Sequence, residues 1–107
     1  MKTLKFNANL ADLILIGKKT VTWRIFDDKD LKVGDLLNLQ VKETGKNFAK
    51  AEIIHIKEKK LGEITEEDQV GHEPFRNKDE MIKTYKKYYS DKVESDTVVK
   101  IIKFKLI

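Results

Sequence analysis

The residues whose types and spacing could do chemistry are concentrated in one short stretch, residues 17–24, with the sequence GKKTVTWR. A predicted helix ends at Gly17 and a predicted strand begins directly after it, and junctions of this kind place side chains at the rim of a sheet, where clefts form. Lys19, Thr22 and Arg24 can then converge on one small volume. Two cations and a hydroxyl group suit a phosphate, a carboxylate or a polarised carbonyl. A partly buried lysine beside an arginine can also lose its proton near neutral pH, which would allow Lys19 to act as a base.

The same stretch also fits a simpler interpretation, a solvated basic edge strand in which the lysines block aggregation. Period-two alternation would place Thr20, Thr22 and Arg24 on one face of that strand. Trp23 would lie on the other face, where we expect the indole to pack in the core rather than to stack on a ligand.

Arg24 and Arg76 are the only arginines in the chain. Each is a candidate for bidentate recognition of an anion, which lysine does poorly, although codon usage alone could explain their rarity.

A second cluster lies in the loop 71–76, GHEPFR, which holds the only proline. Glu73 is followed there by Pro74, whose φ is fixed, and a glycine lies shortly before it. A carboxylate held in this way could face Lys19 and complete an acid–base pair. Because glutamate is common in this sequence, a surface Glu73 without such a role is the alternative.

The composition limits the class of protein. A chain of 107 residues, 40% of them apolar, suits one globular domain spanning residues 1–107. The 22 basic and 18 acidic residues give a mildly basic net charge of +4. The sequence has no cysteine, and no apolar run approaches the roughly 20 residues of a membrane span. We therefore expect a cytoplasmic protein without a membrane partner. We expect the protein to be a monomer or a weak dimer. His55 and His72 do not have the spacing of metal ligands, so we expect no metal and no other cofactor.

The expected elements follow the order β-α-β-β-β-α-α-β. We predict strands at residues 2–6, 20–26, 36–42, 48–57 and 97–107, a helix at 10–16 capped by Asn9, a short helical turn at 66–69 and a helix after Asn77. This order lacks regular βα alternation and favours a small, mostly antiparallel barrel or curled sheet with helices on its open side. In the last strand the apolar alternation slips at Ile101 and Ile102, which suggests a bulge.

Residues 17–24 resemble the G-x-K-x-x-x-x-R signature of the ASCH family, small domains of the PUA-like superfamily. Residues 33–35, VGD, are similar to the turn that precedes the next strand in that family, and residues 97–107 resemble its closing strand. The resemblance covers nearly the whole chain. It implies an α+β, mostly β fold, a small barrel of about five or six strands with two or three capping helices. It also implies a cleft lined by the lysine and arginine of the signature.

The same resemblance implies binding of RNA or of modified nucleosides and nucleotides through that cationic cleft. This is the function we rank first, and a protein-interaction module is a further alternative. The residues that we expect to contact the ligand are Lys18, Lys19, Thr20, Thr22, Arg24 and Arg76.

One branch of the family, the bacterial N4-acetylcytidine amidohydrolases, offers a second function. Its G-x-K-T-x-T-x-R pattern matches residues 17–24. The resemblance implies that Lys19 is the base and Thr22 the nucleophile of an amide hydrolysis. It places the acid at Glu73, with Glu67 as the alternative, because the match passes through a loop of uncertain length.

Overall fold

The computed structural model describes residues 1–26, 29–72 and 74–107, so that Glu73, a predicted site residue, lies outside the described residues. The described residues form one five-stranded sheet, two α-helices and two short 3-10 turns. In chain order these are β1 (Lys2–Phe6), α1 (Ala8–Leu15), β2 (Val21–Ile25), β3 (Leu36–Val41), β4 (Asn47–Lys60), η1 (Leu61–Glu63), η2 (Glu67–Gln69), α2 (Lys78–Tyr88) and β5 (Val98–Leu106).

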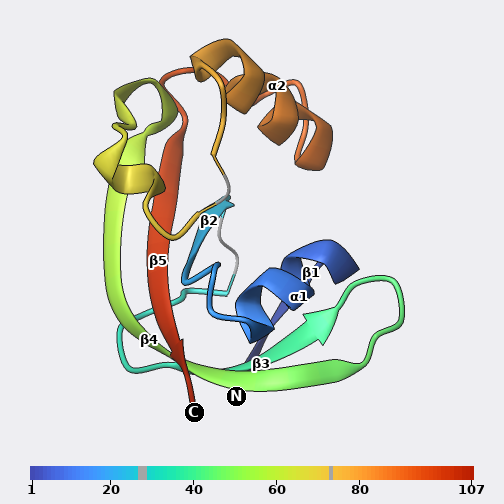
Figure 1. Ribbon diagram of the computed structural model, residues 1–107. Helices are drawn as coiled ribbons and strands as arrows, with labels where there is room; N and C mark the ends of the chain where they lie inside the picture. The colour runs from blue at the N-terminus through green and yellow to red at the C-terminus, as the bar shows by residue number, and fades with distance from the viewer. Residues whose placement is uncertain (27–28, 73) are drawn as a thin grey trace.

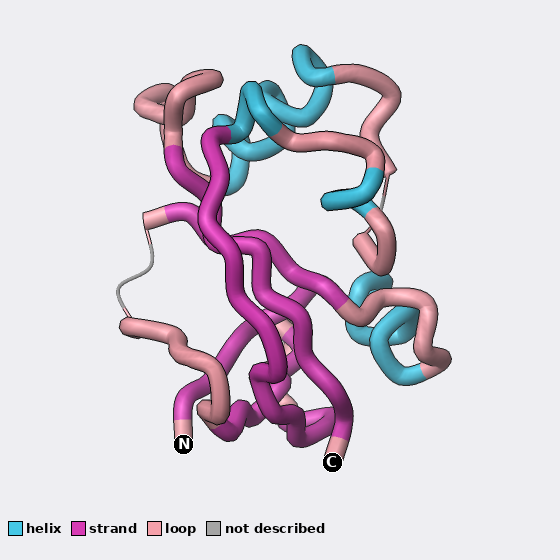
Figure 2. The backbone as a smooth tube through the Cα atoms, turned by 90° about the vertical axis from the view of Figure 1, so that its left-hand side faces the viewer, coloured by secondary structure: helices cyan, strands magenta, loops and turns pink. Residues whose placement is uncertain are grey.

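The sheet has the strand order β1-β3-β4-β5-β2, in which β1 runs parallel to β3 and every other pair is antiparallel. The long strands β4 and β5 bend along their length, so that the sheet curls into an open half-barrel (Figure 1). The N- and C-termini lie at the same end of the molecule (Figure 2). The expected small α+β fold, a mostly antiparallel curled sheet with helices at its open side, is confirmed.

Two hydrophobic clusters divide the core, and β5 contributes to both. Ile102 packs in the cluster that includes Phe6 and Ile14, whereas Ile101 packs in the cluster that includes Trp23 and Met81. Successive residues of a strand point to opposite faces, so both faces of β5 are covered at this point.

The predicted bulge at Ile101 and Ile102 is therefore wrong. Both residues pair in register with β4, and the apolar alternation slips there because the strand passes between two cores. The register shift lies instead on the partner strand, between Ile53 and His55.

Helix α1 begins two residues earlier than predicted. Asn7, not Asn9, occupies the N-cap position. The backbone N–H of Ala8 donates to both carboxylate oxygens of Glu43, each at 3.1 Å. A residue from the β3–β4 hairpin therefore provides an acceptor for a backbone N–H that has no partner within the helix. A carboxylate also suits the positive end of the helix dipole.

Helix α2 starts as predicted. The side chain of Asn77 accepts a hydrogen bond from the Glu80 N–H at 2.8 Å. Met81 and Tyr85 are buried, whereas Tyr88 is 58% exposed. No helix of the described residues has the length and apolar character needed to span a lipid bilayer.

Candidate functional site

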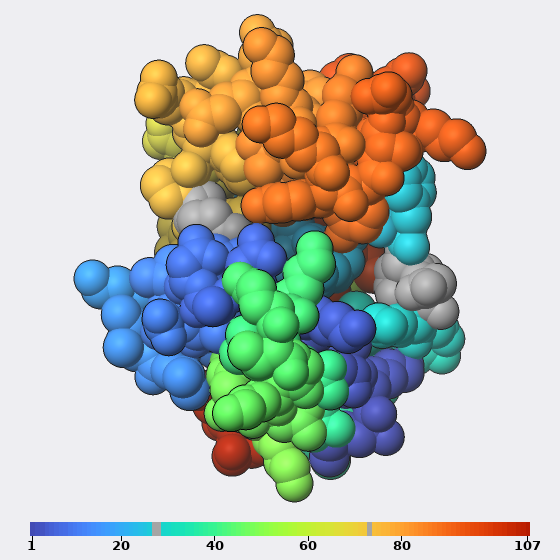
Figure 3. Space-filling view, turned by 90° about the vertical axis from the view of Figure 1, so that its right-hand side faces the viewer, coloured from blue at the N-terminus to red at the C-terminus, as the bar shows by residue number. Residues whose placement is uncertain are grey.

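A cavity of about 250 Å³ is lined by residues of β1, of α1, of β2 and of α2. Helix α2 lies at one end of the molecule, and α1 lies between it and the end formed by β3 and β4 (Figure 1). Strand β2 forms the floor of the cavity. In the space-filling view, the side chains of α2 lie above those of α1 and of the β3–β4 hairpin, along a seam between the two halves (Figure 3). The lining side chains fall into a polar group, Lys5, Asn7, Lys19, Thr22, Arg24 and Lys42, and a mainly apolar group, Phe6, Leu10, Trp23, His72, Tyr85, Tyr88 and Tyr89.

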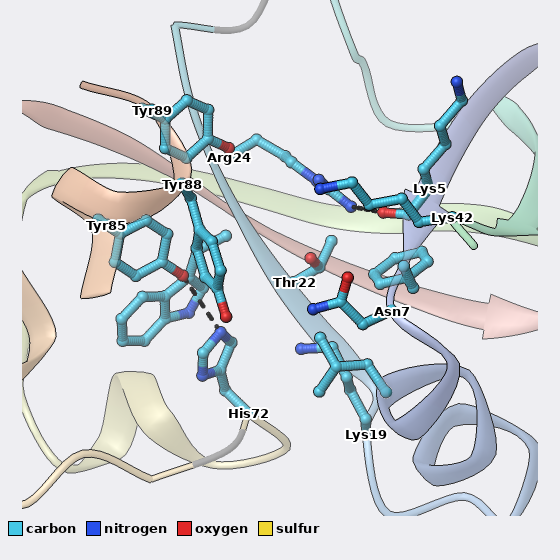
Figure 4. Close-up of a pocket in the computed structure, with 13 residues that line it drawn as sticks. Lys5, Asn7, Lys19, Thr22, Arg24, Lys42, His72, Tyr85, Tyr88 and Tyr89 are labelled. Atoms are coloured by element: carbon cyan, nitrogen blue, oxygen red, sulfur yellow. Dashed lines mark hydrogen bonds between the residues drawn. The ribbon is translucent and has the colours of Figure 1, made fainter.

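The polar side of the cavity is formed by Asn7, Lys19 and Thr22, whose side chains point toward one another (Figure 4). Lys19 is held at the end of α1, where its backbone N–H donates to the Leu13 carbonyl at 3.1 Å. Its side chain is only 3% exposed, and its Nζ donates to the Val21 carbonyl at 2.8 Å. The Thr22 side chain is buried as well. A buried lysine side chain and a buried hydroxyl group thus share one wall of the cavity.

The opposite wall is aromatic. The ring of His72 stacks on the indole of Trp23, with centroids 4.0 Å apart and planes 16° apart. Tyr85 lies 6.0 Å from the same indole, and its hydroxyl is 3.5 Å from His72 Nε2. Tyr88 extends over the cavity beside them (Figure 4). Trp23 is buried in the core, as expected, and it also lines the cavity.

Arg24 lies at the rim of the cavity, where it bridges the two edge strands of the sheet. Its guanidinium lies 4.9 Å above the ring of Phe6, and its Nη2 donates to the Lys5 carbonyl at 3.2 Å. Arg24 Nε is buried and has no hydrogen-bond partner among the described residues. The cation–π contact orients the guanidinium without neutralising its charge.

The loop that carries His72 is fixed to the start of β2 through Gly71. The Gly71 carbonyl accepts hydrogen bonds from the N–H groups of Thr20 and Val21, at 2.9 and 3.1 Å. Gly71 has φ +81°, and a Cβ at this position would lie 2.3 Å from Thr20 Oγ1. Only glycine therefore allows this close approach, which brings His72 to the cavity.

Replacing Gly71 with alanine is expected to lower the free energy of unfolding by about 2–4 kcal/mol. The left-handed backbone costs a residue with a Cβ about 1–2 kcal/mol, and the contact with Thr20 adds to this. Gly17→Ala is the matched control, because Gly17 has the same φ of +81° but open space around its Cβ position. Urea denaturation of both variants measures the difference, and equal losses would contradict the tight packing of Gly71 against β2.

The structure brings together three of the predicted site residues, Lys19, Thr22 and Arg24, on one cavity. Thr20 is half-buried beside Gly71 and does not line it. Lys18 is exposed. Arg76 is 89% exposed and forms an ion pair with Glu80 at 3.7 Å.

The predicted acids do not line the cavity in the part of the chain that is described. Glu67 is exposed at the start of η2 and is not among the lining residues. Glu73 is one of the residues not described. No group of three or more His, Cys, Asp or Glu side chains within residues 1–26, 29–72 and 74–107 is placed to hold a metal ion.

Sequence reasoning missed most of the other lining residues. Phe6 and Asn7 reach the cavity only because β1 and β2, although not paired, lie close enough for the Arg24 contact. No local pattern could show this. Tyr88 and Tyr89 did carry a signal, since tyrosines beside Lys86 and Lys87 suit stacking on bases, but their helical spacing favoured the core.

Comparisons with known proteins were made by sequence and by fold. No family model and no curated protein matches the chain. The fold is similar to that of the Enterococcus faecalis V583 protein EF3133, of family DUF984, with a TM-score of 0.84 at 13% identity over 100% of this chain and 76% of that one. It is similar to an ASCH domain from Lactobacillus crispatus JV V101, with a TM-score of 0.74 at 18% identity over 98% of this chain and 79% of that one. It is also similar to hypothetical protein PH0355, with a TM-score of 0.76 at 26% identity over the full length of both chains. The protein thus has the fold of an ASCH-type domain.

Proposed function

We propose that the cavity binds a base of RNA or of a modified nucleotide. The observation that carries this proposal is the division of the cavity into a polar wall and an aromatic wall. A nucleobase has flat faces that stack on aromatic rings and an edge that exchanges hydrogen bonds. The Asn7 amide and the Thr22 hydroxyl can both donate and accept, and Lys19 adds a donor.

The charge around the cavity supports the same proposal. Lys5, Arg24 and Lys42 lie at or near the rim of the cavity. A guanidinium held in place by Phe6 suits bidentate recognition of a phosphate. The net charge of +4 favours modest, salt-sensitive binding of nucleic acid rather than tight binding.

A fluorescence titration tests this proposal, because Trp23 is the only tryptophan and lies in the cavity wall. Addition of short single-stranded RNAs to the wild type should change the tryptophan emission saturably. Arg24→Ala should weaken the binding roughly tenfold to a hundredfold, through loss of charge-assisted hydrogen bonds. It should also make the dependence of log K on log salt shallower by about 0.7.

Arg76→Ala is the matched control, because Arg76 is the only other arginine, is exposed and forms an ion pair with Glu80. It should bind RNA as the wild type does. Absence of any saturable signal with the wild type, or equal losses in the two arginine variants, would contradict the proposal.

A second candidate function, removal of the acetyl group from N4-acetylcytidine-type nucleosides, is favoured by the burial of Lys19 and Thr22 on one wall. In this proposal the neutral amine of Lys19 takes the proton of the Thr22 hydroxyl and becomes an ammonium group, and Thr22 Oγ1 attacks the amide carbonyl. The amine leaves with a proton from an acid, a role that the family resemblance gives to Glu73. Water then hydrolyses the acetyl-threonine ester to acetate. Incubation of the protein with N4-acetylcytidine, followed by chromatography for cytidine, tests whether the reaction occurs.

A further inference from the structure

A second cavity of about 400 Å³ adjoins the first and is lined by residues of β1 and β2 and by Phe26, Lys29, Leu31 and Tyr89. The two cavities share three lining residues, Lys5, Arg24 and Tyr89. The first cavity alone is slightly smaller than the range of about 300–1,000 Å³ that is common for small-molecule sites, whereas the two together fall well within it. Two basic residues, Lys5 and Arg24, and one aromatic residue, Tyr89, therefore lie at the boundary between the two cavities.

Tyr89 is fixed at this boundary by a backbone contact. Its hydroxyl accepts a hydrogen bond from the Ile25 N–H at 3.3 Å, at the end of edge strand β2. Its ring lies 6.1 Å from that of Tyr85 at an angle of 13°, so it continues the aromatic wall of the first cavity toward the second.

Phe26 adds an exposed aromatic ring to the second cavity. Its side chain is 58% exposed, although phenylalanine is usually buried, and it contacts Tyr89 edge-on with centroids 6.0 Å apart. Its backbone has φ +54°, a left-handed conformation that bulky residues rarely adopt. Strained backbone of this kind is concentrated at ligand sites. The exposure of the apolar ring and the left-handed backbone of Phe26 are both unfavourable in free energy.

The charges between the two cavities point to an anion at their boundary. Arg24 and Lys5 both line the shared wall, and Arg24 Nε has no hydrogen-bond partner among the described residues. A phosphate placed there would lie between two aromatic compartments. This order of stacking site, cation and stacking site is that of single-stranded nucleic-acid grooves, in which bases stack and cations follow the backbone.

We propose that the ligand is a single-stranded RNA segment of at least two nucleotides rather than a free nucleoside. One base occupies the first cavity, the linking phosphate lies at Arg24 and Lys5, and the neighbouring base stacks against Phe26 and Tyr89. This inference rests on the proposed binding function and specifies the ligand of that same site.

Affinity measurements with three probes, cytidine, its monophosphates and the trinucleotide r(CCC), test the proposal. The trinucleotide offers a phosphate and a neighbouring base on both sides, so the polarity of the strand need not be known. Wild-type protein should bind it at least tenfold more tightly than cytidine, because stacking of one more base and a phosphate contact are both added. The monophosphates should lie between the two.

Phe26→Ala should remove most of the advantage of the trinucleotide over cytidine. Cytidine reports on the first cavity in the same variant, because Phe26 does not line that cavity. Lys5→Gln should reduce the affinity for both phosphate-bearing probes. Val70→Ala is the control, since Val70 is 73% exposed and lines neither cavity.

Equal affinities of the wild type for cytidine and r(CCC), or an undiminished advantage in Phe26→Ala, would overturn this inference and leave the proposed function in place. If the wild type binds none of the probes, the proposed function itself fails and this inference with it.

Discussion

Replacement of Lys19 with methionine is expected to lower deacylation of N4-acetylcytidine by roughly 10²–10⁴-fold, the range typical of a lost general base. Lys19 is the buried lysine on the polar wall of the cavity, beside Thr22, and the reaction uses its neutral amine. Without its amine, nothing else on that wall would take the proton of the Thr22 hydroxyl in the proposed reaction. Initial rates of cytidine release, followed by chromatography, measure the loss.

The fold should tolerate this substitution. The Val21 carbonyl loses the donor that lies 2.8 Å away, but the burial of a polar amine is also relieved, and the two changes oppose each other. Thermal melts followed by circular dichroism check this. Lys18→Met is the matched control, because Lys18 is the adjacent lysine and is exposed. A Lys19→Met protein as active as the wild type would remove Lys19 from the mechanism, and an inactive wild type would leave RNA binding as the only proposed function.

Replacement of Asp68 with asparagine is expected to lower the free energy of unfolding at pH 7 by about 2–4 kcal/mol, less than the roughly 3–5 kcal/mol for a fully buried ion pair because its two lysine partners are partly exposed. The Asp68 side chain is 1% exposed and forms ion pairs with Lys57 and Lys59, the latter at 2.7 Å. It also accepts hydrogen bonds from the backbone N–H and the hydroxyl of Thr65, at 2.9 and 3.0 Å. An asparagine amide would direct N–H groups toward these donors.

The difference between the wild type and Asp68→Asn should depend on pH. Burial by itself would raise the pKa of Asp68, but the hydrogen bonds from Lys57, Lys59 and Thr65 outweigh it and hold this pKa well below its ordinary value. A carboxyl group with a depressed pKa stabilises the fold fully above its unfolded pKa, about 3.9, and loses this contribution as the pH falls further. The difference should therefore be constant between about pH 5 and 8 and should shrink below about pH 4.

Urea denaturation of both proteins across this pH range makes the measurement. Glu66→Gln, a change at a nearby exposed residue, should leave the stability almost unchanged. A loss below about 0.5 kcal/mol for Asp68→Asn at pH 7 would place it among ordinary surface changes and contradict the role of Asp68 as a buried anchor for β4 and η2.

Local signals in the sequence predicted most of the fold. The strand at 2–6 and the Asn77 cap depend on residues close in the chain, and both were found as expected. The errors came from distant contacts. Glu43, in the β3–β4 hairpin, accepts a hydrogen bond from the first residue of α1. Strand β5 lies between two cores, so its apolar pattern resembles that of a bulged strand although its pairing with β4 is regular at Ile101 and Ile102.

For the site as well, the part that depends on local sequence was predictable and the part that depends on distant contacts was not. Lys19, Thr22 and Arg24 were predicted to converge because a glycine-terminated helix followed directly by a strand brings them to one rim, and all three line the cavity. The aromatic wall could not be predicted in this way. It is assembled from Trp23, from the loop fixed by Gly71 and from α2, and only the tertiary packing of the three brings those rings together.

Chemical-shift mapping with r(CCC) tests most directly the central claim, that the two-walled cavity is the binding site. The amides of residues 19–24 and 71–72 should shift on titration of the ¹⁵N-labelled protein. The indole N–H of Trp23, which is buried without a hydrogen-bond partner among the described residues, should shift with them. Shifts confined to residues of β4 around Lys50, which is exposed and lines neither cavity, with the cavity amides unchanged, would contradict the claim.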